Sequence, residues 1–449
     1  MYSEQEKSFR HKRFLYAMII LVGIILMDTA FVKIYDIIDK NFIPIQTKIV
    51  LFSINSSLCL FLQFFIIRYL QRSFNVGHLK RPLKIKSFYP TALVSLIVLG
   101  ALIGYMIFQV LYFGYYVTSL TILIIVLSYG TATAFIIHLS LLFFSWYRSS
   151  HNLIVFLYFV SMSIIAFNLV TTAAFASAKV SDKPYQVEVY VGGGGDVSGG
   201  KHVLLDNIYR VSSFMSFFSI WVTTAILMNS YREKLVNAFA YWIILSIPLV
   251  YFLITYFYQV ILIRTLISYI EIDPVTVSIV LSAFLSLSRP IGGLIFGFAF
   301  WNISRIVSYE RNIKTYMIIS GWGILLIFAA NQGITQLVTP YPPFGLATIT
   351  VLTTASYLMM IGIYNSATLV SANNELRKTI HKRASESKLL DVIGHAEMEK
   401  EIQKTVKQLS RDTNELEKEL EEPVELDELE LEKYIEFVVK EVRKQANVK

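Results

Sequence analysis

Cysteine, charge and clustered histidine are what this sequence has least of. The single cysteine, Cys59, excludes any disulfide within the chain and leaves no pair of thiolates for a metal site. Charged residues make up 16% of the chain, whereas soluble domains carry about 25%. The 7 histidines are scattered, and no two of them have metal-ligand spacing on one predicted helix. Without a cluster of nucleophile, base and metal ligands, we expect no enzyme activity, no catalytic residue, no cofactor, no metal ion and no nucleic-acid partner.

Apolar residues fill the chain instead. They make up 55% of its 449 positions, aromatic residues make up 14%, and the mean hydropathy is +0.56. Apolar runs of about 18 residues or more recur, and each is long enough to cross a bilayer as a helix. The sequence therefore predicts an all-α, polytopic transmembrane helix bundle of about ten spans. The number of spans is given to within about one pair. The predicted spans are residues 14–37, 48–70, 90–113, 117–146, 151–177, 210–231, 238–266, 274–303, 314–334 and 344–371.

Basic residues alternate between the predicted connections. Lys and Arg are concentrated before the first span and after every second span, whereas the other connections have few or none. Because cytoplasmic loops carry the excess of Lys and Arg, both termini are predicted to be cytoplasmic. The chain then divides into a transmembrane bundle, 1–371, with an outside loop at 178–209, and a cytoplasmic tail, 372–449. We expect a multi-pass protein of the plasma membrane, in contact with the lipid bilayer.

The outside loop contains a motif that resembles a phosphate-binding loop. Gly195 to His202 reads GDVSGGKH, which has the G-x-x-x-x-G-K spacing. His202, however, replaces the Ser or Thr whose hydroxyl would reach Mg²⁺, and about thirty residues on the outside of a membrane are too few for a nucleotide domain. The preceding Tyr185 to Val191 alternates apolar and polar residues, and the glycines turn the chain. We interpret the loop as a β-hairpin that pairs back over His202 to Leu205.

Charges inside the predicted spans are rare. Asp28 is the one acidic residue well inside a span, and Arg289 lies within the eighth. Each is costly in hydrocarbon without a partner, and each lies roughly 21 Å above the inner surface if the helices are regular. We therefore predict a buried ion pair between Asp28 and Arg289 that joins the first and eighth helices. Asn168 and Asn331 are interpreted as interhelical hydrogen-bonding residues.

A broken helix is predicted around Arg289. Pro290 removes a helix hydrogen bond, and the glycines that follow allow another backbone to approach closely. Discontinuous helices of this kind surround the sites of transporters, but a kinked helix packed tightly on a neighbour has the same pattern. His138, alone in an apolar span, is interpreted as a packing residue rather than a proton relay. The intramembrane site candidates are Asp28, His138, Arg289, Pro290, Gly292 and Gly293.

The tail has a different composition. Its basic segment, 377–388, is suited to anionic lipid headgroups. Apolar residues from Ile402 to Leu420 follow the alternating three- and four-residue spacing of a short coiled coil, which leaves open a homodimer, a soluble protein partner or a helical hairpin folded on itself. No Gly or Pro interrupts Val370 to Ile393, so we predict a tail that is helical from about Ala372 to Leu420 and largely continuous with the tenth span.

Two segments carry a resemblance to other proteins. SRPIGGLIFGFAFW (Ser288–Trp301) and SESKLLDVIGHAEMEKEI (Ser385–Ile402) are similar to segments of uncharacterised multi-span membrane proteins of ammonia-oxidising archaea. That group has no established activity, so the resemblance implies a multi-span membrane protein and transfers no functional residue.

Three roles fit these features. The first is a receptor-like sensor that passes a signal from the bundle to the tail. The second is a secondary transporter of a small solute, built from two inverted five-span halves on either side of the 178–209 loop. The third is a membrane scaffold subunit whose tail binds a soluble protein. We expect the sensor.

Overall fold

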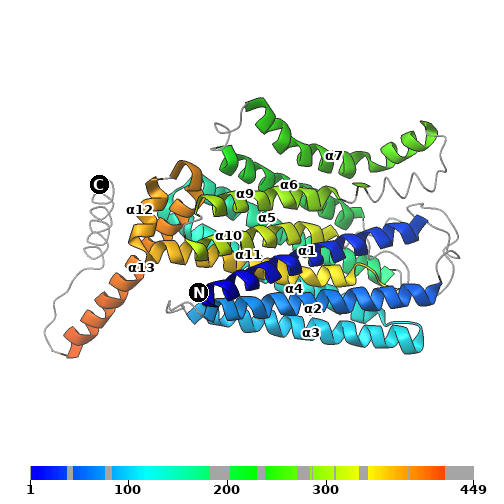
Figure 1. The fold of residues 1–449 in the computed structure, drawn as a ribbon, viewed down its shortest axis with the longest axis horizontal. Helices are drawn as coiled ribbons and strands as arrows, with labels where there is room; N and C mark the ends of the chain where they lie inside the picture. Colours follow the sequence, from blue (N-terminus) through cyan, green and yellow to red (C-terminus); the bar gives the residue numbers. More distant parts are fainter. Residues whose placement is uncertain are drawn as a thin grey trace.

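The computed structural model describes residues 2–37, 44–75, 83–182, 203–229, 238–269, 284–285, 287–307, 310–332, 342–382 and 384–419. Every regular element in these ranges is helical (Figure 1). The helices are α1 (Tyr2–Ile37), α2 (Ile45–Asn75), α3 (Leu83–Phe113), α4 (Thr118–Ser150), α5 (Leu153–Asp182), α6 (Val203–Met228), α7 (Ala238–Tyr269), α9 (Ser288–Ile306), α10 (Arg311–Asn331), α11 (Leu346–Ala372), α12 (Asn374–Lys382) and α13 (Ala384–Glu419).

Membrane-spanning length and composition are found in 7 of the described helices. The stretches that qualify are Ile45–Gln71, Phe88–Phe113, Thr118–Ser150, Leu153–Ser181, Val203–Met228, Asn312–Asn331 and Leu346–Ala372. The structure therefore supports a multi-pass membrane helix bundle. The figure of ten spans remains a prediction, because the stretches predicted at 14–37, 238–266 and 274–303 are not among those that qualify.

The predicted β-hairpin falls mostly outside the described residues. Residues 183–202, including the phosphate-loop-like motif, are not described. The part that is described, Val203 to Leu205, forms the first turn of α6 rather than a strand. The prediction of a returning strand at these residues is wrong, because the helical backbone of α6 begins at Val203.

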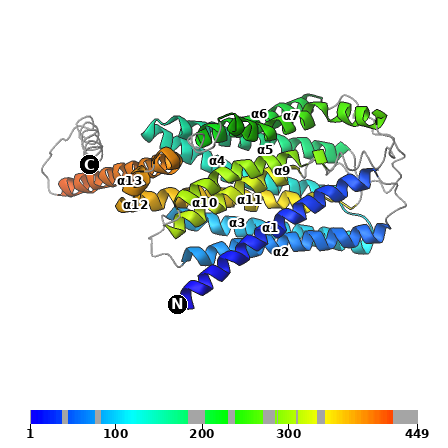
Figure 2. The same ribbon diagram turned by 45° about the horizontal axis from the view of Figure 1, so that its top comes forward.

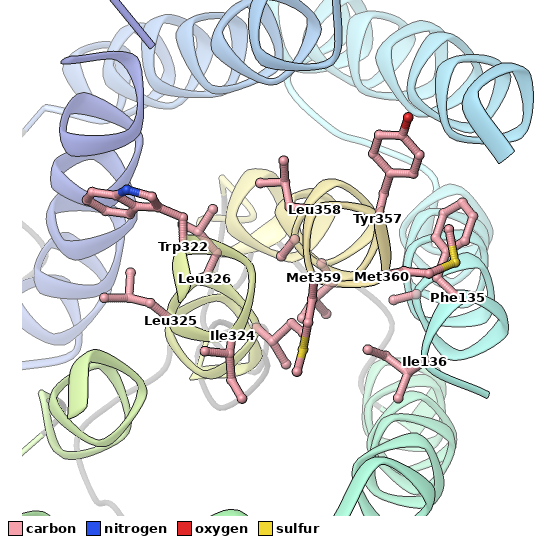
Figure 3. Packing of buried hydrophobic residues seen from close by; sticks show 14 of the residues in the cluster. Phe135, Ile136, Trp322, Ile324, Leu325, Leu326, Tyr357, Leu358, Met359 and Met360 are labelled. Atoms are coloured by element: carbon pink, nitrogen blue, oxygen red, sulfur yellow. The ribbon is translucent and has the colours of Figure 1, made fainter. Parts of the chain in front are cut away.

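The central element of the bundle is α11. An 18-residue window of its spanning stretch is entirely buried, whereas 33% of the corresponding windows in α2 and α3 is buried. It packs against α10, α4, α2 and α3, and its sequence, LATITVLTTASYLMMIGIYNSATLVSA, contains no charged residue. Figure 3 shows α10 and α11 side by side, with Met360 of α11 directed toward Phe135 of α4. The outer helices expose large apolar side chains such as Phe61 and Tyr112, as expected for surfaces in contact with lipid.

The described part of the tail turns back onto the bundle. Helix α11 ends at Ala372, and Asn373 has an extended backbone (φ −114°, ψ 105°). The Asn373 side chain accepts a hydrogen bond from the amide of Leu376, at 3.1 Å, and so caps α12. Helix α13 then packs against α11, α4, α5 and α9. The described part of the tail is helical, as predicted, and Asn373 interrupts its continuity with α11, because an N-capping asparagine ends a helix without Gly or Pro.

The start of α1 and the two tail helices lie at the same end of the bundle (Figures 1 and 2). We call this the tail end and the opposite end, where α2, α4 and α11 begin, the far end. The position of the start of α1 and of the tail helices at one end agrees with the alternation of Lys- and Arg-rich connections along the sequence.

Candidate functional site

The buried charge on α1 lies at the start of the central helix. Asp28 is 1% exposed. Its carboxylate accepts hydrogen bonds from the amide of Gly345 (3.0 Å), the hydroxyl of Thr348 (2.5 Å) and the side-chain amide of Asn55 (3.1 Å). Gly345 is the N-cap residue of α11 and has a left-handed backbone (φ 87°), which favours glycine. Asp28 therefore caps α11 from a neighbouring helix, where free amides and the helix dipole stabilise a negative charge.

The buried charge on α9, Arg289, lies at the C-terminal end of a neighbouring helix, α10. Arg289 is 6% exposed. Its guanidinium donates to the hydroxyl of Ser213 (2.6 Å), the hydroxyl of Tyr209 (3.3 Å) and the main-chain carbonyl of Asn331 (3.4 Å). Asn331 is the last residue of α10, so its carbonyl belongs to the negative end of that helix dipole. Arg289 is thus held by a helix C-terminus and two hydroxyls.

The predicted ion pair between Asp28 and Arg289 is wrong. The hydrogen-bond partners described for both side chains are neutral groups, and none of the ion pairs among the described residues includes either one. Both helices pack on α10, but their other neighbours differ, since α1 packs on α2 whereas α9 packs on α7 and α6. Each charge is compensated by a helix end, the negative charge by the start of α11 and the positive charge by the end of α10.

Asn331 connects Arg289 to a larger polar network. Its side-chain oxygen accepts from the Tyr129 hydroxyl (3.1 Å), and its amide donates to the side-chain oxygen of Asn168 (3.1 Å). Asn168 in turn donates to Ser212 (3.1 Å). These bonds join α4, α5, α6 and α10, so the interhelical bonding expected of Asn168 and Asn331 is present. We call Tyr129, Asn168, Ser212, Ser213, Tyr209, Arg289 and Asn331 the arginine network.

Hydroxyl and amide side chains also hold α11 to its other neighbours. Gln63 of α2 donates to Thr350 (2.9 Å) and accepts from Thr354 (2.9 Å). Thr131 of α4 shares a hydrogen bond of 2.7 Å with Thr353. The part of α11 nearer the far end is therefore fixed by directed polar contacts on two sides.

Nearer the tail end, contacts between backbones replace hydrogen bonds. A Cβ atom on Gly323 of α10 would lie 2.6 Å from the amide nitrogen of Met359, and one on Gly362 of α11 would lie 2.7 Å from the carbonyl oxygen of Tyr316. Real Cβ atoms essentially never approach so closely, so α10 and α11 touch through their main chains. Main-chain atoms, which cannot rotate out of the way, therefore oppose a displacement of one helix along the other.

The glycines singled out in the sequence pack α9 onto its neighbours. A Cβ on Gly292 would lie 2.3 Å from the Phe217 ring of α6, and one on Gly293 would lie 3.0 Å from the Leu325 carbonyl oxygen of α10. Pro290 lies in the first turn of α9, which begins at Ser288, a position where a missing amide is tolerated. The discontinuity predicted at Pro290 thus coincides with the start of α9. Residues 274–283 of the predicted eighth span lie outside the described part of the chain.

His138 packs near the tail-end half of α4. Its ring centroid lies 4.5 Å from that of Phe88. It lines a small cavity together with Phe88, Leu142, Met360, Ile361 and Tyr364. These neighbours are apolar or aromatic, as expected of a packing histidine.

The docking of α13 is the part of the site that sequence reasoning missed. The Trp146 indole of α4 donates to the Glu397 carboxylate at 2.7 Å, and both residues are buried. Ser149 donates to Glu399. A Cβ on Gly394 would lie 2.2 Å from a methyl carbon of Val370 at the end of α11. The buried face consists of Leu389, Leu390, Ile393, Ala396 and Glu397.

The spacing of that face was readable in the sequence. Leu389, Ile393, Ala396 and Glu397 follow the three- and four-residue repeat of one helix face. The assumption that α11 continued straight into the tail concealed it, because a straight helix would carry this face away from the bundle.

The chain matches no protein-family model, no curated protein and no solved structure.

Proposed function

We propose that this protein is a receptor-like sensor of the plasma membrane, with both termini in the cytoplasm, in which α11 couples the far end of the bundle to the tail. One observation carries the proposal, namely that the first turn of α11 receives Asp28 and its last turns pack on Gly394 of α13. A helix of 27 residues is about 40 Å long, enough to cross the roughly 30 Å hydrocarbon layer.

The packing around α11 favours transmission over local relaxation. Close-packed elements move between discrete arrangements rather than deforming continuously. Since α10 and α11 touch through Gly323 and Gly362, a shift caused at the Asp28 cap or at Asn331 displaces the end of α11 near Val370. The output is then a change in how α13 is held against α4 and α11.

The contact between α13 and α4 is suited to a reversible output. Glu397 is 5% exposed and is held by the Trp146 indole, with Lys400 at 3.8 Å. Burying a carboxylate is costly even when it is hydrogen-bonded. The free-energy difference between the docked and the released tail is therefore smaller than it would be for an apolar contact of the same size.

Cross-linking between α4 and α13 tests the proposal. Ser149→Cys and Glu399→Cys, in a Cys59→Ser background, place two thiols where the native side chains are in contact. We expect Asp28→Asn, which weakens the cap of α11, to change the rate of cross-linking by a short bifunctional thiol reagent several-fold. The matched control is Trp221→Phe, which removes the indole hydrogen bond to Leu245 between α6 and α7 and lies away from the tail. Equal cross-linking in all variants would contradict the coupling.

A transporter is the second candidate, and the arginine network favours it. Arg289 is a buried cation held by neutral groups, an arrangement suited to a small anion that takes the place of one of those groups. Inverted symmetry between the two halves remains a prediction. Uptake of labelled small anions into proteoliposomes by the wild-type protein, and its loss in Arg289→Gln, would favour transport. The absence of uptake by the wild-type protein would favour the sensor.

The partners that we propose for the tail are anionic headgroups, a second copy of the chain or a soluble protein, the last as in the scaffold role. Arg377 donates to the Ser371 carbonyl (3.1 Å), and Lys378 pairs with Glu375 (3.5 Å). The side chains of residues 382–387 and those beyond 408 lie outside the described part, as do residues 420–449. The coiled-coil pattern from Ile402 to Leu420 therefore remains a prediction.

A further inference from the structure

Two histidines and an aspartate meet where the tail doubles back. His381 lies on α12, and Asp391 and His395 lie on α13 (Figure 1). The Nδ1 atom of His381 is 3.3 Å from both oxygens of the Asp391 carboxylate. The Nε2 atom of His395 is 3.7 Å from Oδ1 of Asp391. One potential donor atom from each of the three residues lies within 4.8 Å of the other two.

These separations are close to those of donor atoms around one metal ion. Zinc binds imidazole nitrogen and carboxylate oxygen at about 2.0–2.2 Å, so donors at the corners of a tetrahedron are about 3.4 Å apart. The separations from Asp391 to the two histidines, 3.3 and 3.7 Å, bracket that value.

Burial at the cluster also fits a metal ion. The Asp391 side chain is 13% exposed, whereas those of His381 and His395 are 58% and 33% exposed. An anchored carboxylate with accessible imidazoles leaves a path for an ion and a water molecule.

We propose that His381, Asp391 and His395 form a binding site for a divalent transition-metal ion of the Zn²⁺ class, with a fourth position open to water. Two imidazoles and one carboxylate suit zinc and its neighbours, whereas Ca²⁺ and Mg²⁺ prefer oxygen ligands. The sequence predicted no metal ion because no two histidines have metal-ligand spacing on one predicted helix. The structure pairs Asp391 and His395, four residues apart on α13, with a histidine from the preceding helix.

The position of the site indicates what a bound ion would do. The ligand His395 directly follows Gly394, the residue of α13 that packs on Val370. An ion shared by α12 and α13 would fasten the helical hairpin in the shape that docks on the bundle. The inference goes beyond the sensor proposal, because metal binding at this hairpin does not require the tail to move.

Titration of the full-length protein tests the site. The protein should be purified with a tag that contains no histidine, stripped with EDTA and titrated with ZnCl₂ by calorimetry, and with CoCl₂ followed by visible absorption. We expect one ion per chain, and a tetrahedral Co²⁺ spectrum. His381→Ala, Asp391→Asn and His395→Ala should each weaken binding at least about tenfold, since even changes outside the ligand set cost 10–100-fold in metal sites.

The controls keep the test independent of folding. His151→Asn changes an exposed histidine in the turn between α4 and α5, where the backbone is left-handed (φ 48°) and Asn is tolerated, so Zn²⁺ affinity should be unchanged. His381 is the most exposed of the three ligands, so His381→Ala remains informative even where His395→Ala fails to fold. No binding by the wild-type protein, or equal binding by wild type and His381→Ala, would overturn the proposal. Cross-linking between α4 and α13 plays no part in this measurement, so failure here leaves the sensor proposal standing.

Discussion

Replacing Asp28 tests how the bundle compensates its buried charges. In Asp28→Ala, three donors lose their acceptor at once, namely the Gly345 amide, the Thr348 hydroxyl and the Asn55 side-chain amide. The substitution also uncaps the helix at the centre of the molecule. The structure therefore predicts a large loss of stability from a residue whose described hydrogen-bond partners are all neutral.

The size of the loss follows from the donors. A buried donor without an acceptor costs about 1–3 kcal/mol. The Thr348 hydroxyl recovers part of this by turning to a carbonyl of its own helix, and Asn55 lies on the partly exposed α2. The Gly345 amide is one of the free amides at the start of α11 and has no such alternative. We expect a decrease of about 2–5 kcal/mol in the free energy of unfolding.

Reversible unfolding in mixed micelles, followed by circular dichroism as denaturing detergent increases, measures this decrease. Thr348→Val keeps the shape of the side chain and removes one of the three hydrogen bonds, so its cost should be about 1 kcal/mol. An Asp28→Ala variant no less stable than Thr348→Val would mean that the carboxylate does not cap α11.

A double-mutant cycle decides between helix-end compensation and a direct ion pair. Because Asp28 and Arg289 share no partner, the effects of Asp28→Ala and Arg289→Gln should add to within about 0.5 kcal/mol. A coupling free energy well above about 1 kcal/mol would refute this account and restore the ion pair.

Two further predictions concern packing and the tail. Gly297→Ala should lower the free energy of unfolding by about 1–3 kcal/mol, because its Cβ would lie 2.6 Å from the Gly321 carbonyl oxygen, whereas Gly104→Ala, with nothing within 4 Å, should be neutral in the same unfolding assay. Trp146→Phe should leave the Glu397 carboxylate without its indole donor and speed amide exchange in α13. The control Trp242→Phe, at a residue that is 44% exposed, should leave this exchange unchanged. Unchanged exchange in both variants would contradict the role given to the Trp146 indole.

The general architecture could be predicted because it depends on local properties of the chain. Whether a stretch such as 344–371 forms an apolar helix follows from its own composition, and the structure places α11 there. The ends of helices were harder to predict. The turn at Asn373 depends on a single side chain that caps the next helix, and rules based on Gly and Pro do not detect it.

The partners of the buried charges could not be predicted by matching side chains of opposite sign. The depth estimate for Asp28 and Arg289 considered only the charges of side chains. The ends of α10 and α11 also carry partial charges, and these stabilise both residues. The cluster of His381, Asp391 and His395 was missed for a related reason. Two of its members are four residues apart on one helix, but the third is brought in by a turn that the sequence analysis did not predict.

The central position of α11 has a consequence for the order of assembly. Ribosomes make α11 after α2, α3, α4 and α10, the membrane-embedded helices that enclose it. Until residue 346 has been synthesised, Gln63 and Thr131 lack the threonines that pair with them, and Asp28 lacks the helix end that stabilises its charge. The earlier helices thus enter the membrane before the helix that packs between them is made. A nascent chain halted before this point would leave these polar side chains without the partners that α11 supplies.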